Sequence, residues 1–87
     1  MHNNDTATEF VVLTAMAKMP QSCWGNYGRI AVCEVKKGVR PKMISERAIG
    51  MVRIVETWER LNIGKTSKCA FQKAMKQAKE MTLKLNA

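Results

Sequence analysis

Residues 54–84 read IVETWERLNIGKTSKCAFQKAMKQAKEMTLK, and the fold prediction starts from this stretch. Residues 54–61 have the apolar spacing of an amphipathic helix, and residues 62–67 gather a glycine and several polar side chains that are typical of a turn. From residue 68 onward the apolar spacing of a helix returns, now with lysines between the apolar positions. The stretch therefore predicts a helix, a short turn and a second, basic helix.

The helix before the turn is predicted to span residues 45–61. Ser45 is a typical N-cap residue, and Glu56 and Arg60 are spaced as a favourable i, i+4 pair on the polar face. Trp58 falls within the apolar stripe, where packing in the core is its usual role. The stripe comprises Ala48, Met51, Val52, Ile54, Val55, Trp58 and Leu61.

The second helix is predicted over residues 67–84, with Thr66 or Ser67 as its N-cap. Its apolar stripe lies opposite a lysine-rich face, so this helix would pack on one side and present charge on the other. The stripe comprises Ala70, Phe71, Ala74, Met75, Ala78, Met81 and Leu85. The polar face comprises Lys68, Gln72, Lys73, Lys76 and Lys79.

The N-terminal part of the chain is predicted to be helical after a disordered start at residues 1–5. Thr6 and Glu9 match a capping box, in which each side chain satisfies a backbone N–H at the start of a helix. The apolar run that follows predicts a helix over residues 8–18. Pro20 ends it, because the residue before a proline is pushed out of the helical region.

Residues 21–38 allow two interpretations. A helix is favoured, because aromatic and apolar residues recur at helical spacing and the segment ends in two lysines and a glycine. The predicted fold class is then all-α: a single domain over residues 1–87, with about four helices that include a helix-turn-helix. The alternative is an α+β winged helix with a hairpin at 30–44, whose cations would add contacts to a nucleic-acid backbone. Those cations are Lys36, Lys37, Arg40 and Lys42.

The chain is strongly basic, and its charged residues are unevenly distributed along the sequence. It has 87 residues, with 15 Lys and Arg against 7 Asp and Glu, and a formal net charge of +8. Up to Gly28 the charged residues are Asp5, Glu9 and Lys18, so the excess of cations lies in the rest of the chain. This distribution predicts a polyanionic partner, most simply nucleic acid. The alternative is a solvated lysine face that contacts nothing.

No constellation of residues suited to catalysis or metal binding is found in the sequence. The three cysteines are widely spaced and His2 is the single histidine, so a zinc site lacks ligands. Gly64-Lys65-Thr66 looks like the end of a phosphate-binding loop, but Glu59 stands where that pattern needs another glycine. We expect no enzyme activity, no metal, no cofactor and no small-molecule ligand. The sequence has no apolar run long enough to cross a membrane and no signal peptide, so we expect a cytoplasmic location and no membrane partner.

The helix, turn and basic helix together predict binding to double-stranded DNA. A helix-turn-helix places its second helix in the major groove, where the exposed side chains of the turn and of that helix meet bases and phosphates. Lysines would hold phosphates, and Gln72 can pair bidentately with adenine. The predicted DNA-binding residues are Arg60, Lys65, Thr66, Ser67, Lys68, Gln72, Lys73 and Lys76.

Residues 55–64, VETWERLNIG, followed by Ser67 and residues 71–75, FQKAM, are similar in their order to a family of small repressors. These are the helix-turn-helix repressors of plasmids and fimbrial operons, the TrfB/KorA-like and PapB-like regulators. Residues 31–38, AVCEVKKG, resemble the helix that precedes the motif in those proteins. The resemblance implies an all-helical dimer that binds an operator. We therefore expect a sequence-specific transcriptional repressor, associated with the bacterial nucleoid, that binds a palindromic operator.

A homodimer is predicted from the small size of the chain and from the two-fold symmetry of most operators. The candidate dimer surfaces are Phe10, Leu13 and Met16 in the first helix, or Met81, Leu83 and Leu85 in the last. An alternative function is a phage or plasmid protein that docks on a host protein and inhibits it. Seven methionines in so short a chain can form an adaptable binding surface.

Overall fold

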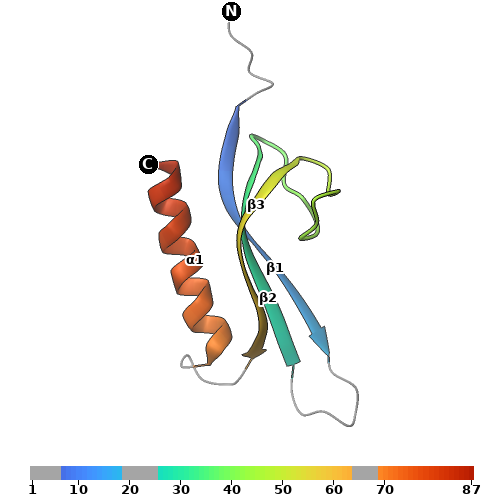
Figure 1. Cartoon of the computed structure of the whole chain (residues 1–87), viewed down its shortest axis with the longest axis vertical. Coiled ribbons are helices and arrows are strands. Elements are labelled where there is room, and N and C mark those ends of the chain that lie inside the picture. Colours follow the sequence, from blue (N-terminus) through green and yellow to red (C-terminus); the bar gives the residue numbers. More distant parts are fainter. Residues whose placement is uncertain (1–6, 19–25, 64–68) are drawn as a thin grey trace, which may run out of the picture.

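The computed structural model describes residues 7–18, 26–63 and 69–87, and it shows a three-stranded antiparallel sheet with one helix packed against it (Figure 1). The elements are β1 (Thr8–Lys18), β2 (Asn26–Lys36), β3 (Met51–Ile63) and α1 (Ala70–Asn86). β2 is the central strand, and each strand pairs with its neighbour in the sequence. The prediction of an all-α domain of four helices is therefore wrong, since three of the four elements in the described residues are strands. The predicted helix-turn-helix is therefore also wrong.

β2 is difficult to assign from sequence because both of its faces are covered. Ile30, Ala31, Val32 and Cys33 are all fully buried. Ile30 and Val32 pack toward α1, whereas Ala31 and Cys33 pack on the opposite face of the sheet. Such a strand lacks the alternation of apolar and polar residues that marks a half-exposed strand. Its sequence is therefore equally compatible with a buried helix. The helix favoured for residues 21–38 is wrong over residues 26–36, which form β2; residues 19–25 lie outside the described part of the chain.

The helix predicted over residues 8–18 is also wrong, because these residues form β1. The strand pairs with β2 from Thr8 opposite Lys36 to Lys18 opposite Asn26. Its first half is aromatic and β-branched, which favours a strand over a helix. The carboxylate of Glu9 accepts a hydrogen bond from the backbone N–H of Gly38 at 3.3 Å, which makes it part of the sheet end. Residues 1–6, which include the predicted disordered start and Thr6, lie outside the described residues.

β3 replaces the helix predicted over residues 45–61, and its irregularity explains the error. The register between β2 and β3 shifts at Gly28/Ile30, Val32/Cys33 and Glu34/Val35, and Arg60 adopts a left-handed φ of 55°. These bulges break the two-residue alternation of a regular strand. As a result Val55, Trp58 and Leu61, which are three residues apart, all pack on the face covered by α1. This spacing imitates that of a helix, although the predicted packing of Trp58 against the core is confirmed.

α1 confirms the predicted basic helix, and it covers one face of the sheet. Phe71, Ala74 and Ala78 are buried against Ile30 and Val32 of β2. Ala70 and Leu85 of the predicted stripe are exposed instead. The helix begins at Ala70, after Cys69 as its N-cap residue, whereas Thr66 and Ser67 lie outside the described residues.

The loop over residues 37–50 covers the upper part of the other face of the sheet (Figure 1). Its Ile44 is buried against Leu13, Ala31, Cys33 and Val35. The neck of the loop is closed by a hydrogen bond from the N–H of Lys36 to the carbonyl oxygen of Gly50 at 2.8 Å. The winged-helix alternative therefore has its first strand in β2 but no return strand at 39–44, because the chain returns to the sheet only in β3.

The outer edge of β1 is partly occupied by side chains of the same chain. The amide of Asn86 donates to the carbonyl oxygen of Phe10 at 2.8 Å and accepts from its N–H at 2.9 Å. The guanidinium of Arg40 donates to the carbonyl oxygen of Val12 at 3.3 Å. These contacts satisfy backbone groups that an edge strand would otherwise offer to another chain.

Some of the candidate dimer residues are packed in the core and others are exposed. Leu13 is buried and Met81 packs against the α1 core, so neither is available as a surface. Met16 and Leu83 are 71% and 73% exposed. No helix in the described residues is both long and apolar enough to cross a membrane.

Candidate nucleic-acid interface

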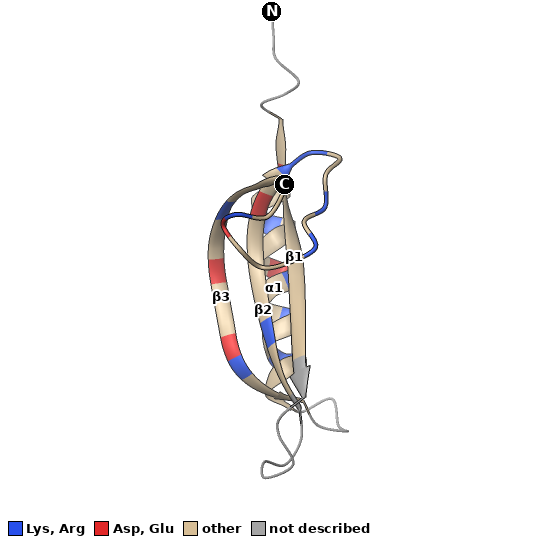
Figure 2. Ribbon diagram, turned by 90° about the vertical axis from the view of Figure 1, so that its right-hand side faces the viewer, with Lys and Arg blue, Asp and Glu red and all other residues tan. Residues whose placement is uncertain are grey.

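The exposed face of α1 presents lysines along its whole length. Gln72, Lys73, Lys76, Lys79 and Lys84 are all exposed, while the buried positions of the helix face the sheet. This segregation follows from the helical period, because residues three or four apart share a face. The single acid within the helix is Glu80, so the face carries a net positive charge. Figure 2 shows these lysines as blue bands along the helix behind the sheet.

Two acidic side chains, Glu34 and Glu59, are paired with arginines of the sheet. Arg29 pairs with Glu59 at 3.2 Å, and Arg53 pairs with Glu34 at 2.7 Å; these are the ion pairs within residues 7–18, 26–63 and 69–87. Both pairs join strands of the sheet. The lysines of α1 take part in neither pair, so their charge is available for an external anion.

A second group of cations lies at the end of β2 and in the loop that follows it. Lys36, Lys37, Arg40, Lys42 and Arg47 are exposed, and Glu46 is the single acid in this part of the sequence. The loop lies on the opposite face of the sheet from α1, so the two basic groups are separate surfaces (Figure 1). The winged-helix alternative includes most of these residues, but it omits Arg47, which the sequence places in a helix.

The predicted DNA-binding residues are only partly brought together. Gln72, Lys73 and Lys76 share the exposed face of α1, as predicted. Lys65, Thr66, Ser67 and Lys68 lie outside the described residues. Arg60 belongs to β3 and lines a hollow together with Tyr27 and Arg29 of β2. Tyr27 and Arg29 lie on the face of β2 opposite to Ile30, which packs toward α1. The structure therefore places Gln72, Lys73 and Lys76 on one exposed face and Arg60 on a different element.

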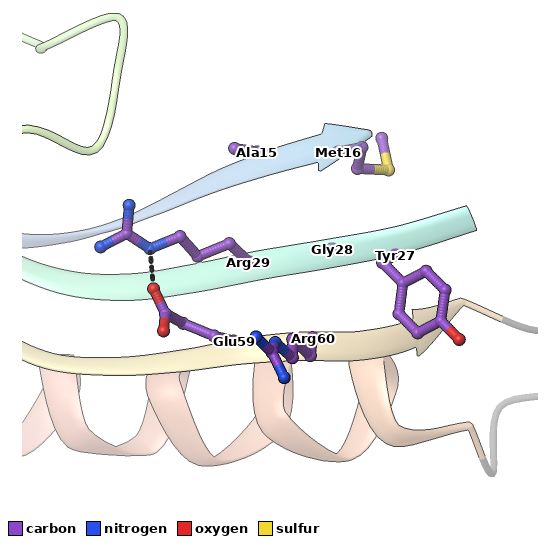
Figure 3. Close-up of a pocket in the computed structure, with 7 residues that line it drawn as sticks. All are labelled: Ala15, Met16, Tyr27, Gly28, Arg29, Glu59 and Arg60. Carbon is purple, nitrogen blue, oxygen red and sulfur yellow. Dashed lines mark ion pairs between the residues drawn. The ribbon is translucent and has the colours of Figure 1, made fainter. Parts of the chain in front are cut away.

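The hollow around Arg60 lies on the lower part of the sheet, which the loop does not cover. It has a volume of about 430 Å³ and is lined by Ala15, Met16, Tyr27, Gly28, Arg29, Glu59 and Arg60. Figure 3 shows Arg29 and Glu59 facing each other across β2 and β3, with Tyr27 toward the end of β3. Because Glu59 neutralises Arg29, the hollow has mixed charge and is a weaker anion site than the face of α1.

Two titratable groups show the opposite effects of hydrogen bonding and burial. Hydrogen bonds from the hydroxyl of Thr8 and from Arg53, both at 2.7 Å, lower the pKa of Glu34. Burial raises the pKa of the Cys33 thiol, and the positive charge of Arg29 offsets this only in part. Cys33 is therefore protonated at neutral pH and is a core residue rather than a nucleophile.

The chain matches no protein-family model, no curated protein and no solved structure. The resemblance to plasmid and fimbrial repressors thus stays a prediction, and the all-helical fold that it implies is wrong.

Proposed function

We propose that the chain binds double-stranded DNA through the lysine face of α1. The observation that carries this proposal is the row of exposed cations Lys73, Lys76, Lys79 and Lys84 on a helix whose other side is fixed to a sheet. A helix held in this way can approach the phosphate backbone without losing its packing. Lysine contacts to phosphates release counterions, and that release supplies much of the affinity of nucleic-acid-binding proteins.

The proposed role is that of a small regulator of transcription in the bacterial cytoplasm. Gln72 lies beside the lysines on the exposed face of α1, where its amide can pair with an adenine edge if the helix enters the major groove. Sequence preference would then come from Gln72 and phosphate affinity from the lysines. In this proposal α1 acts without the turn and first helix of a helix-turn-helix.

Fluorescence anisotropy with a labelled duplex, repeated over a series of salt concentrations, tests this proposal. The double variant K73Q/K76Q should bind more weakly and should lower the slope of log K against log[salt] by about 0.9 for each phosphate that the variant no longer neutralises. The matched control is Glu80→Gln, which removes a charge of opposite sign from the same helix and should tighten binding. An unchanged salt slope in K73Q/K76Q would rule out α1 as the binding surface, and equal affinity for all duplexes would rule out base readout.

A further inference from the structure

The loop over residues 37–50 exposes large apolar side chains beside its cations. Val39, Met43 and Ile49 are 38%, 60% and 87% exposed. They line one groove with a volume of about 450 Å³, together with Arg40, Lys42 and Arg47. Pockets of roughly 300–1,000 Å³ are large enough to hold a ligand or the side chains of a bound segment. The groove is thus both apolar and positively charged.

The exposure of these side chains is fixed by the fold of the loop. Pro41 and Ile44 are buried, and Arg29 donates to the carbonyl oxygen of Ile44 at 3.4 Å. Two further hydrogen bonds, from the N–H groups of Ala48 and Arg47 to the carbonyl and hydroxyl oxygens of Ser45, shape the tip. The neck is also tightly packed, since a Cβ at Gly50 would lie 2.4 Å from Val39 Cγ1. A loop held in this way keeps Met43 and Ile49 in water while Pro41 and Ile44 pack inward.

We propose that this groove is a docking site for an acidic, leucine-containing segment of another protein. Carboxylates of such a segment would pair with Arg40, Lys42 and Arg47, and its apolar side chains would fill the space between Val39, Met43 and Ile49. Methionine and arginine are among the residues enriched in the buried parts of protein interfaces. The charge of the groove selects an acidic partner and works against a second copy of this basic chain.

Two other occupants fit the groove less well. A nucleic-acid backbone would use the cations but would leave the three apolar side chains in water. A membrane with anionic lipids would contact both the cations and the apolar side chains. Its surface is flat, however, whereas these side chains line a groove. The loop that carries the groove lies on the opposite face of the sheet from α1 (Figure 1), so this inference does not depend on DNA binding.

The test uses the whole chain and a short fluorescein-labelled peptide in which leucines alternate with aspartates. The double variant M43S/I49S should weaken binding of this peptide about tenfold, which is the effect expected when a central apolar side chain is truncated. R47E should weaken it by a similar factor. The matched control is Leu83→Ser, which changes a side chain that is 73% exposed on α1, away from the groove, and should leave peptide affinity unchanged.

Three outcomes would overturn the proposal. In the first, a peptide with serines in place of leucines binds as well, which would reduce the contact to charge alone. In the second, M43S/I49S retains full affinity for the original peptide. In the third, vesicles of phosphatidylserine bind the chain in an Ile49-dependent manner while the peptide does not, which would assign the groove to a membrane surface.

Discussion

Replacing Gly28 with alanine tests the close contact that joins α1 to the central strand. A Cβ at this position would lie 2.5 Å from Phe71 Cδ2, 2.6 Å from Phe71 Cε2 and 3.1 Å from Ile63 Cδ1. Carbon atoms in favourable contact are about 3.5–4.0 Å apart, so the ring of Phe71 would have to move by about 1 Å. Gly28 has no left-handed φ, so backbone strain does not enter the comparison.

The expected cost of Gly28→Ala follows from two opposing effects. Overpacking a close-packed core costs about 1–3 kcal/mol. Alanine recovers about 0.5–1 kcal/mol, because glycine loses more backbone freedom on folding. The net loss in the free energy of unfolding should therefore be about 1 kcal/mol or somewhat more, and each kcal/mol lowers the Tm of a domain of this size by about 4–8 °C.

Urea unfolding followed by far-ultraviolet circular dichroism measures this loss, and a second substitution identifies its cause. Phe71→Leu destabilises the wild-type core, but in the Gly28→Ala background it should cost less, with a coupling energy of about 0.5 kcal/mol or more. The control is Gly38→Ala, where φ is +86° and no atom lies within 4 Å, so strain costs about 1 kcal/mol without coupling to Phe71. Additive losses in G28A/F71L would refute the proposed contact.

Three further predictions concern the strands. Arg60→Gly should raise stability by up to about 1 kcal/mol in urea unfolding, because relief of the left-handed φ of 55° gains about 1–2 kcal/mol and the extra backbone freedom that glycine loses costs about 0.5–1 kcal/mol; a loss would mean that the Arg60 side chain stabilises the sheet. The folded-state pKa of Glu34 is below its ordinary value of 4.5, so its stabilising effect is present above that pH and lost as pH falls through the lower folded-state pKa. Glu34→Gln should therefore reduce the loss of stability in acid, and an unchanged acid limb would contradict this. Asn86→Ala should cost about 1 kcal/mol and increase self-association in sedimentation, because it uncovers Phe10 at the edge of β1; Asn86→Asp, which keeps an acceptor, should be intermediate.

The sequence predicted α1 well because several local features agree there. The segment is long, its apolar residues follow the helical period, and it has few β-branched residues. The predictions for β2 and β3 were wrong for two separate reasons. β2 is covered on both faces and so loses the alternation of a strand, while the bulges of β3 place Val55, Trp58 and Leu61 on one face at a helix-like spacing.

The candidate surfaces show the same division between local and long-range information. Gln72, Lys73 and Lys76 were placed together correctly, because the helical period alone decides which residues share a face of α1. The groove of the loop was not predictable, because Met43 and Ile49 are exposed only when Pro41 and Ile44 fold onto a sheet formed by distant residues.

The burial of β2 on both faces also determines how the backbone exchanges its hydrogens with solvent. Amides of Ile30, Val32 and Cys33 lie in a strand with a neighbour on each side and no exposed surface, so they become accessible when the whole domain opens. Amides at the ends of α1 and on the outer edges of β1 and β3 can exchange through smaller local openings. The slowest amides of β2 thus report the global free energy of unfolding of this chain under native conditions, without denaturant.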